Sequence, residues 1–173
     1  QRIDRDLNKS LDFDRVLFIP ARQSPLKKKV PGGGSEERLE MLRLAIDGRD
    51  DFAISDIELN RTGPSYTIDT IKELQRNGTV GSRPGLIIGD DLVGSLSRWK
   101  GHEELMEMVR LIVARREGGI SSGGPWEHEV VDNAVIPVSS SEIRERVRQR
   151  RAYRYIVPES VYHYIEANGI YRT

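Results

Sequence analysis

Short, uninterrupted runs of apolar residues alternate along the chain with longer segments in which apolar residues recur at helical spacing. An uninterrupted apolar run is typical of a strand that is buried on both faces, as in a parallel sheet. The runs predict strands at Val16–Ile19, Phe52–Leu59 (with an irregularity near Asp56), Gly85–Ile88, Val109–Ala114 and Ala134–Val138. Residues 126–130 predict no definite element.

The amphipathic segments between these runs predict helices that cover the sheet. We expect helices within residues 1–12 and over 35–48, 67–78, 92–96, 103–108, 140–150 and 158–168. Ser35 is the expected cap of one of them, Ser65 or Thr67 of the next, and Pro158 suits the first position of the last helix. Because strands and helices alternate, the pattern predicts an α/β fold with a doubly wound (Rossmann-like), mostly parallel sheet. We expect a single domain over 1–173, with a helical C-terminal part over 139–173.

Composition and charge narrow the classes of function. The 27 Lys and Arg residues balance 27 Asp and Glu residues, so a bulk nucleic-acid-binding surface is not indicated. Cysteine is absent, which excludes disulfides and thiolate chemistry and fits a reducing, cytoplasmic location. No stretch approaches the length of a membrane span, and no secretory signal is visible. The histidines lack metal-ligand spacing, so we expect no metal site built from protein ligands.

The stretch Val138–Arg146 has the residues of a phosphate-binding helix start. Ser139 and Glu142 have the spacing of a capping box, so a helix is expected to begin there. Hydroxyl groups and backbone N–H groups would then lie at the positive end of the helix, and Arg144 follows in its first turns. Taken alone, the stretch also fits a capped surface helix whose arginines face water.

Three other segments place polar residues after predicted strands, at the edge where open α/β sheets bind ligands. Gly89 and Asp91 follow the third strand. Glycine there would let a ligand approach the backbone closely, and the carboxylate could accept hydrogen bonds from a ribose. The alternative for Asp90 and Asp91 is that they cap a helix. Trp99 with Lys100 could stack on a flat ring beside an anion, or Trp99 could fill the core. The basic loop 21–34, which contains Lys27, could contact a ligand or simply face water.

Five motifs in order resemble the bacterial nicotinate-nucleotide adenylyltransferases over nearly the whole chain from about Asp14. They are Val16–Ala21, Ser65–Thr70, Ile87–Asp91, Arg98–Lys100 and Val138–Arg144. The resemblance implies transfer of AMP from ATP to nicotinate mononucleotide, with release of nicotinate adenine dinucleotide and pyrophosphate. It also implies in-line attack without a covalent intermediate, and Mg²⁺ accompanying ATP.

The resemblance also implies roles for single residues. Tyr66 and Thr67 match the segment whose backbone holds the nicotinate carboxylate, and Trp99, with Lys100 beside it, matches the ring that stacks on the pyridine. On the ATP side, Gly89 and Asp91 match the glycine-x-aspartate element near the ribose. The residues that match the phosphate-gripping motif are Ser139, Ser140, Ser141 and Arg144. Arg144 is the expected catalytic residue.

Two departures from the family pattern are visible. The family usually has a histidine in the basic loop where this chain has Leu26, although Lys27 retains a cation. The family's first strand, glycine-rich turn and histidine signature have no counterpart. Because that strand is central in such a sheet, its absence would leave neighbouring backbone groups unpaired, and we expect the natural protein to carry about thirty further N-terminal residues.

Other functions stay open from the sequence. A relative that adenylates phosphopantetheine is one, although the Tyr66–Thr67 and Trp99 features favour a flat carboxylated ring. A non-catalytic nucleotide-binding module is another, and a nucleic-acid binder using the basic loop is a third. The sequence does not give the oligomeric state, a homo-oligomer included, or the preference between the acid and amide mononucleotides.

Overall fold

The computed structural model describes residues 13–23, 34–116 and 125–172. Its contacts divide the chain into two compact units: the first combines Gln1–Asp14 with Ser65–Pro137, and the second combines Arg15–Pro64 with Val138–Thr173. We describe each unit by itself, and the prediction of a single domain stays a prediction. None of the helices in the described ranges has the length and apolar character that a membrane crossing requires.

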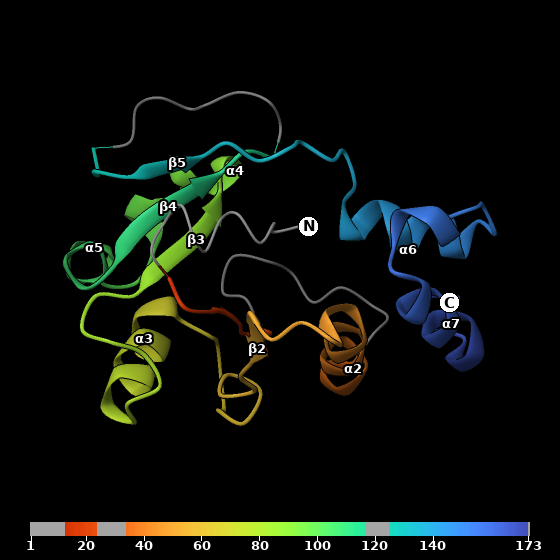
Figure 1. The fold of residues 1–173 in the computed structure, drawn as a ribbon, viewed down its shortest axis with the longest axis horizontal. Helices are drawn as coiled ribbons and strands as arrows, with labels where there is room; N and C mark the ends of the chain where they lie inside the picture. The colour runs from red at the N-terminus through yellow and green to blue at the C-terminus, as the bar shows by residue number, and fades with distance from the viewer. Residues whose placement is uncertain (1–12, 24–33, 117–124, 173) are drawn as a thin grey trace. The chain divides into compact units, whose positions relative to one another are not determined.

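The first unit is built on a three-stranded parallel sheet in the order β3 (Gly85–Gly89), β4 (Arg110–Ala114), β5 (Glu129–Val131). Figure 1 shows the three strands side by side. Leu111, Ile112 and Val113 of the central strand are buried, as the uninterrupted apolar run predicts. The other elements of this unit are α3 (Thr67–Arg76), α4 (Asp90–Val93), the 3₁₀ helix η1 (Leu96–Arg98) and α5 (His102–Met108).

Two apolar clusters hold these elements together. One forms around Ile88 and Val113 of the sheet, and the other joins Ile68 and Ile71 of α3 to Leu105 of α5. The turn into α5 needs a glycine for two reasons. Gly101 has φ +60°, and a Cβ atom there would lie 2.7 Å from the Ile68 side chain.

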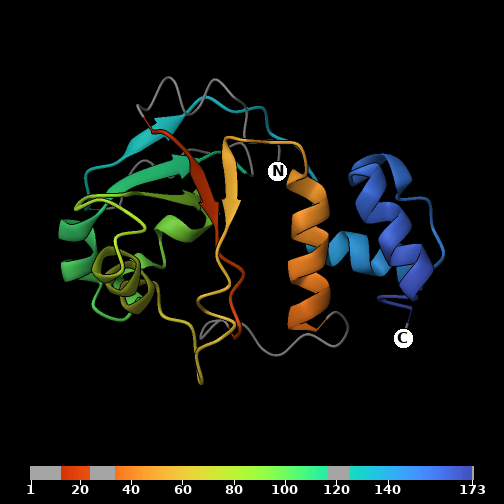
Figure 2. The same cartoon turned by 60° about the horizontal axis from the view of Figure 1, so that its bottom comes forward.

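The second unit contains the parallel pair β1 (Val16–Phe18) and β2 (Phe52–Ile54), seen as red and orange arrows in Figure 2. Its helices are α2 (Ser35–Ile46), α6 (Ser140–Arg148), the 3₁₀ helix η2 (Arg154–Ile156) and α7 (Glu159–Asn168). Ser160 Oγ donates to the Leu44 carbonyl at 2.9 Å, which links α7 to α2. Every strand pair in the described ranges is parallel, so the predicted α/β class with parallel strands is confirmed.

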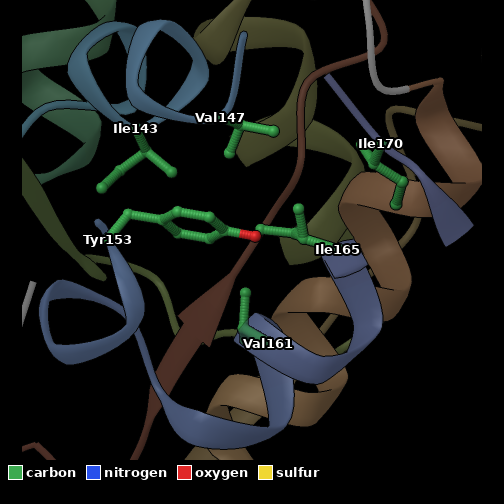
Figure 3. Packing of buried hydrophobic residues seen from close by; sticks show 6 residues of the cluster. All are labelled: Ile143, Val147, Tyr153, Val161, Ile165 and Ile170. Atoms are coloured by element: carbon green, nitrogen blue, oxygen red, sulfur yellow. The ribbon is translucent and has the colours of Figure 1, made fainter. Parts of the chain in front are cut away.

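Tyr153 lies at the centre of the core of the second unit. In Figure 3 its ring is surrounded by apolar side chains of α6 and α7. The buried members of this cluster are Ile143, Val147, Tyr153, Val161, Ile165 and Ile170. The Tyr153 hydroxyl donates to the Glu166 carboxylate at 2.5 Å, and Glu166 also accepts from Arg172 at 2.8 Å. The buried phenol therefore has the hydrogen-bond partner that burial requires.

The predicted fifth strand over Ala134–Val138 is wrong, and β5 lies earlier, at Glu129–Val131. The residues of the expected strand are apolar but pair with no neighbouring strand in the described ranges: Val135 is 41% exposed and Ile136 is 49% exposed. Pro137 has no N–H to donate to a neighbouring strand. The apolar run therefore forms an extended connection instead of a strand.

Several element boundaries also differ from the prediction. The second strand ends at Ile54, because the Asp56 carbonyl accepts from Leu59 and turns the chain. Helix α4 begins at Asp90 instead of Leu92. The N-caps of α2, α3 and α7 are Gly34, Tyr66 and Pro158, and none makes a side-chain capping bond. The helix expected within residues 1–12 lies outside the described residues.

Replacing Tyr153 by Phe tests the hydrogen bond inside the core of the second unit. We expect the free energy of unfolding at neutral pH to fall by about 1–2 kcal/mol, because a bond to a charged acceptor is lost while the ring remains. Urea denaturation of both proteins measures the difference.

The pH dependence of that difference has a definite sign. Burial, followed by the Glu166 carboxylate, raises the pKa of Tyr153 above its ordinary value of 10.0. A raised pKa means that the folded protein holds the proton more tightly, so this stabilisation is complete below pH 10 and is lost as the pH rises further. The gap between wild type and Tyr153→Phe should therefore narrow above pH 10. A gap that widened there would contradict this assignment.

Candidate functional site

The start of α6 has the cap predicted for it. Ser139 is the N-cap, and its Oγ accepts the Glu142 N–H at 3.1 Å. The reciprocal half of the capping box is absent, because the Glu142 carboxylate instead accepts from Arg146 Nε at 2.9 Å. Within the described ranges, the backbone N–H groups of Ser140 and Ser141 have no acceptor. Two backbone donors are thus available at the positive end of the helix.

Arg144 differs from the other arginines of α6. Arg146 and Arg148 form ion pairs with glutamates of the same helix, at 2.8 and 2.5 Å. Arg144 Nη2 donates to the neutral Ser141 hydroxyl at 3.0 Å and has no carboxylate partner among the residues that the structure describes. Burial raises the pKa of Tyr171, and the positive charge of Arg144 opposes this rise. The start of α6 therefore combines backbone donors, hydroxyl groups and an unneutralised guanidinium.

A second group of predicted residues lies at the start of α3 in the first unit. Tyr66 is the N-cap, and the N–H groups of Thr67 and Ile68 have no acceptor within the described part of the chain. Lys100 Nζ lies 4.7 Å from the centre of the Tyr66 ring and donates to both oxygens of Asp69, at 2.9 and 3.2 Å. Lys100 thus fastens the turn before α5 to the first turn of α3.

Trp99 lies beside this group. Its ring is partly buried and packs against both apolar clusters of the first unit, including the one around Ile68 against which Tyr66 also packs. Trp99 Nε1 donates to Ser95 Oγ at 3.4 Å. The side chain therefore has a packing role, as the alternative interpretation expects, while part of its surface stays exposed.

The third group lies where β3 ends. Gly89 is the last residue of the strand and the N-cap of α4. A Cβ atom at Gly89 would collide with the Asp91 carboxylate, so the Asp91 side chain lies close to the backbone at this glycine. Asp91 Oδ2 accepts from Arg116 Nη1 at 3.2 Å. Asp90 and Asp91 both occupy the first turn of α4, where carboxylates complement the helix dipole.

The structure brings together the predicted residues within each unit. Tyr66, Thr67, Trp99 and Lys100 form one group in the first unit, which also holds Gly89 and Asp91. Ser139, Ser140, Ser141 and Arg144 form the group in the second unit. Lys27 lies outside the described residues. In the described ranges, no group of three or more Asp, Glu, His or Cys side chains could hold a metal ion.

Sequence reasoning gave Arg116 no role. A usable signal was present, because Arg115 and Arg116 directly follow a buried strand. The carboxyl ends of parallel strands meet at one edge of a sheet, so cations after β4 lie near carboxylates after β3.

Comparisons with known proteins show which family the chain is similar to. A family profile described as "Cytidylyltransferase-like" matches residues 4–146. A relative from Geobacillus kaustophilus, named "Probable nicotinate-nucleotide adenylyltransferase", is 42% identical over 166 residues, which cover 94% of this chain and 74% of the relative. One of the same name from Borrelia hermsii is 35% identical, covering 96% of this chain and 87% of the relative.

One solved structure has a similar fold. It is the Plasmodium falciparum nicotinic acid mononucleotide adenylyltransferase complexed with NaAD, with a TM-score of 0.71 and 18% identity, covering 92% of this chain and 83% of the other. At that identity the likeness concerns the fold alone. The family is shown by the identity to the curated relatives and by the share of each chain that the matches cover. The chain belongs to the nicotinate-nucleotide adenylyltransferase family, within the cytidylyltransferase-like group.

Proposed function

We propose that the protein transfers AMP from ATP to nicotinate mononucleotide and releases nicotinate adenine dinucleotide and pyrophosphate. Family membership supports this activity. The structural observation that carries it is the start of α6, where unpaired backbone N–H groups, serine hydroxyls and the unneutralised Arg144 suit a polyphosphate.

The mononucleotide is proposed to bind in the first unit. The N–H groups at the start of α3, next to Tyr66 and Thr67, are suited to a carboxylate. The partly exposed Trp99 ring offers a face for the pyridine. Lys100 is already paired with Asp69, so its direct role is to hold Tyr66 in place, and its charge adds to the attraction of the carboxylate.

ATP is proposed to bind through two sets of residues. Ser139, Ser140, Ser141 and Arg144 hold phosphate oxygens, and Lys27 adds a cation. Asp91 accepts hydrogen bonds from a ribose, and Gly89 gives the nucleotide close access to the backbone. Mg²⁺ enters with ATP as part of the substrate and supplies further charge neutralisation.

The proposed chemical step is a single displacement. A phosphate oxygen of the mononucleotide attacks the α-phosphorus of ATP, the bond from that phosphorus to the bridging oxygen breaks, and pyrophosphate leaves with the bond's electrons. The attacking phosphate is already anionic, so no side chain needs to remove a proton. Arg144 and the N–H groups of α6 stabilise charge that grows on the phosphate oxygens.

The assay that tests the proposal is pyrophosphate release from ATP by the full-length natural protein. Nicotinate mononucleotide, nicotinamide mononucleotide and phosphopantetheine are compared as acceptors. Release with the nicotinate acceptor supports the proposal, and release with phosphopantetheine alone would replace it. If no acceptor led to pyrophosphate release, the protein would be a non-catalytic nucleotide-binding module. A cytoplasmic location is part of the same proposal.

Trp99→Ala tests ring stacking. We expect KM for nicotinate mononucleotide to rise by the equivalent of about 1–3 kcal/mol while KM for ATP changes little, because only the former ligand carries the pyridine ring. Trp99→Phe, which keeps an aromatic face, should recover most of the loss. Steady-state kinetics with each substrate varied in turn gives both values. Equal losses for the two substrates would assign Trp99 to packing alone.

Arg144→Ala tests charge stabilisation at α6. We expect kcat to fall about 100-fold, with smaller changes in KM, because charge on the phosphates is greatest in the transition state. Arg148→Ala is the matched control: the same helix loses an arginine that already has a glutamate partner. An unchanged kcat for Arg144→Ala, or an equal loss in the control, would return Arg144 to a surface role.

A further inference from the structure

The ladder of the central strand β4 continues past its last residue through two side chains. The last paired residues are Gly89 with Ala114 on one side and Ala114 with Val131 on the other. Beyond them, Asn133 Oδ1 accepts the Arg115 N–H at 2.8 Å, and Asn133 Nδ2 donates to the Arg115 carbonyl at 2.9 Å. The Asn133 amide thus replaces a peptide of β5, the neighbour seen beside β4 in Figure 1.

On the opposite side, the carboxylate of Asp90 takes the place of β3. Its Oδ1 accepts the Arg116 N–H at 3.1 Å. Consecutive residues of a central strand direct their backbone groups to alternate neighbours, and Arg115 and Arg116 follow that rule with side chains as partners. The backbone just beyond β4 is therefore held from both sides.

Asp90 is unusual for a residue at a strand end. It is only 6% exposed, and its Oδ2 is buried without a partner among the described residues. Burying a carboxylate with one oxygen unsatisfied is unfavourable, so packing alone does not explain an aspartate here. The hydrogen bond that Asp90 accepts within the described ranges comes from Arg116, whose guanidinium pairs with Asp91 at 3.2 Å.

We propose that Asp90 is a positioning residue: through the Arg116 backbone it directs the Arg116 guanidinium to Asp91 and so orients the Asp91 carboxylate for the nucleotide. Asn133 acts on the same backbone from the β5 side. This inference rests on the proposed function, in which Asp91 accepts hydrogen bonds from a ribose of ATP. It predicts that loss of the Asp90 side chain weakens ATP binding only when Arg116 is present.

The first experiment compares two substitutions at Asp90 by steady-state kinetics on the full-length protein. Asp90→Ala removes the acceptor of the Arg116 N–H, and we expect KM for ATP to rise about tenfold with a smaller change in kcat. Asp90→Asn keeps a carbonyl oxygen for that N–H and should restore most of the wild-type KM. If the asparagine variant lost as much as the alanine variant, charge and not the backbone contact would be responsible, and the proposal would fail.

The second experiment is a double-mutant cycle with Arg116→Ala. Because Asp90 acts through Arg116, adding Asp90→Ala to Arg116→Ala should raise KM for ATP no further. Independent, additive effects would overturn the proposal. Asp132→Ala is the matched control, since Asp132 pairs with the neighbouring Arg115 through an exposed carboxylate and makes no contact with the Arg116 backbone in the described structure.

A loss of folding is kept apart from a loss of positioning. Each variant is checked by thermal unfolding, and if Asp90→Ala does not fold, the partly buried Asn133→Ala takes its place, with the same rise in KM expected and the same cycle with Arg116→Ala. A wild-type protein that releases no pyrophosphate would overturn the proposed function and this inference with it. An active wild type whose KM is unchanged by these variants would overturn the inference alone.

Discussion

Parallel pairing of β3 with β4 is the constraint on which the first unit depends. It carries five residue pairs in register, from Gly85 with Arg110 to Gly89 with Ala114. Because both strands end at the same level, Asp90 and Asp91 after β3 meet Arg116 after β4. The sheet thus converts two separate stretches of sequence, one acidic and one basic, into a single cluster of charges at the edge where α/β sheets bind ligands.

In the second unit, helix packing and a helix cap form the candidate site. The residues proposed to bind phosphate lie at the start of α6, and one side of this helix contributes Ile143 and Val147 to the core around Tyr153. Packing of that side fixes the helix, and the Ser139 cap fixes where the helix begins. The donors at its start are therefore already in place for the proposed phosphate, and such preorganisation is what favours helix starts as phosphate sites.

Features that depend on a few neighbouring residues could be predicted from the sequence. The apolar runs that form β1, β3 and β4 and the Ser139 cap of α6 are of this kind. The strand expected over Ala134–Val138 was wrong because an apolar run does not reveal whether a neighbour is available to pair with it. The contacts of Asp91 with Arg116 and of Lys100 with Asp69 join residues 25 and 31 positions apart, and only the folded chain shows them.

The link between Ser160 and the Leu44 carbonyl spans 116 residues of sequence. The α2 side chains Met41 and Leu44 pack against a core whose buried members all come from residues 143–170. During synthesis on the ribosome, α2 therefore emerges long before α7, which packs against it, whereas nearly all of the first unit is made without interruption in between. The second unit can complete its core only after residues 143–170 have been made, and until then its apolar surfaces remain open to chaperones or to aggregation.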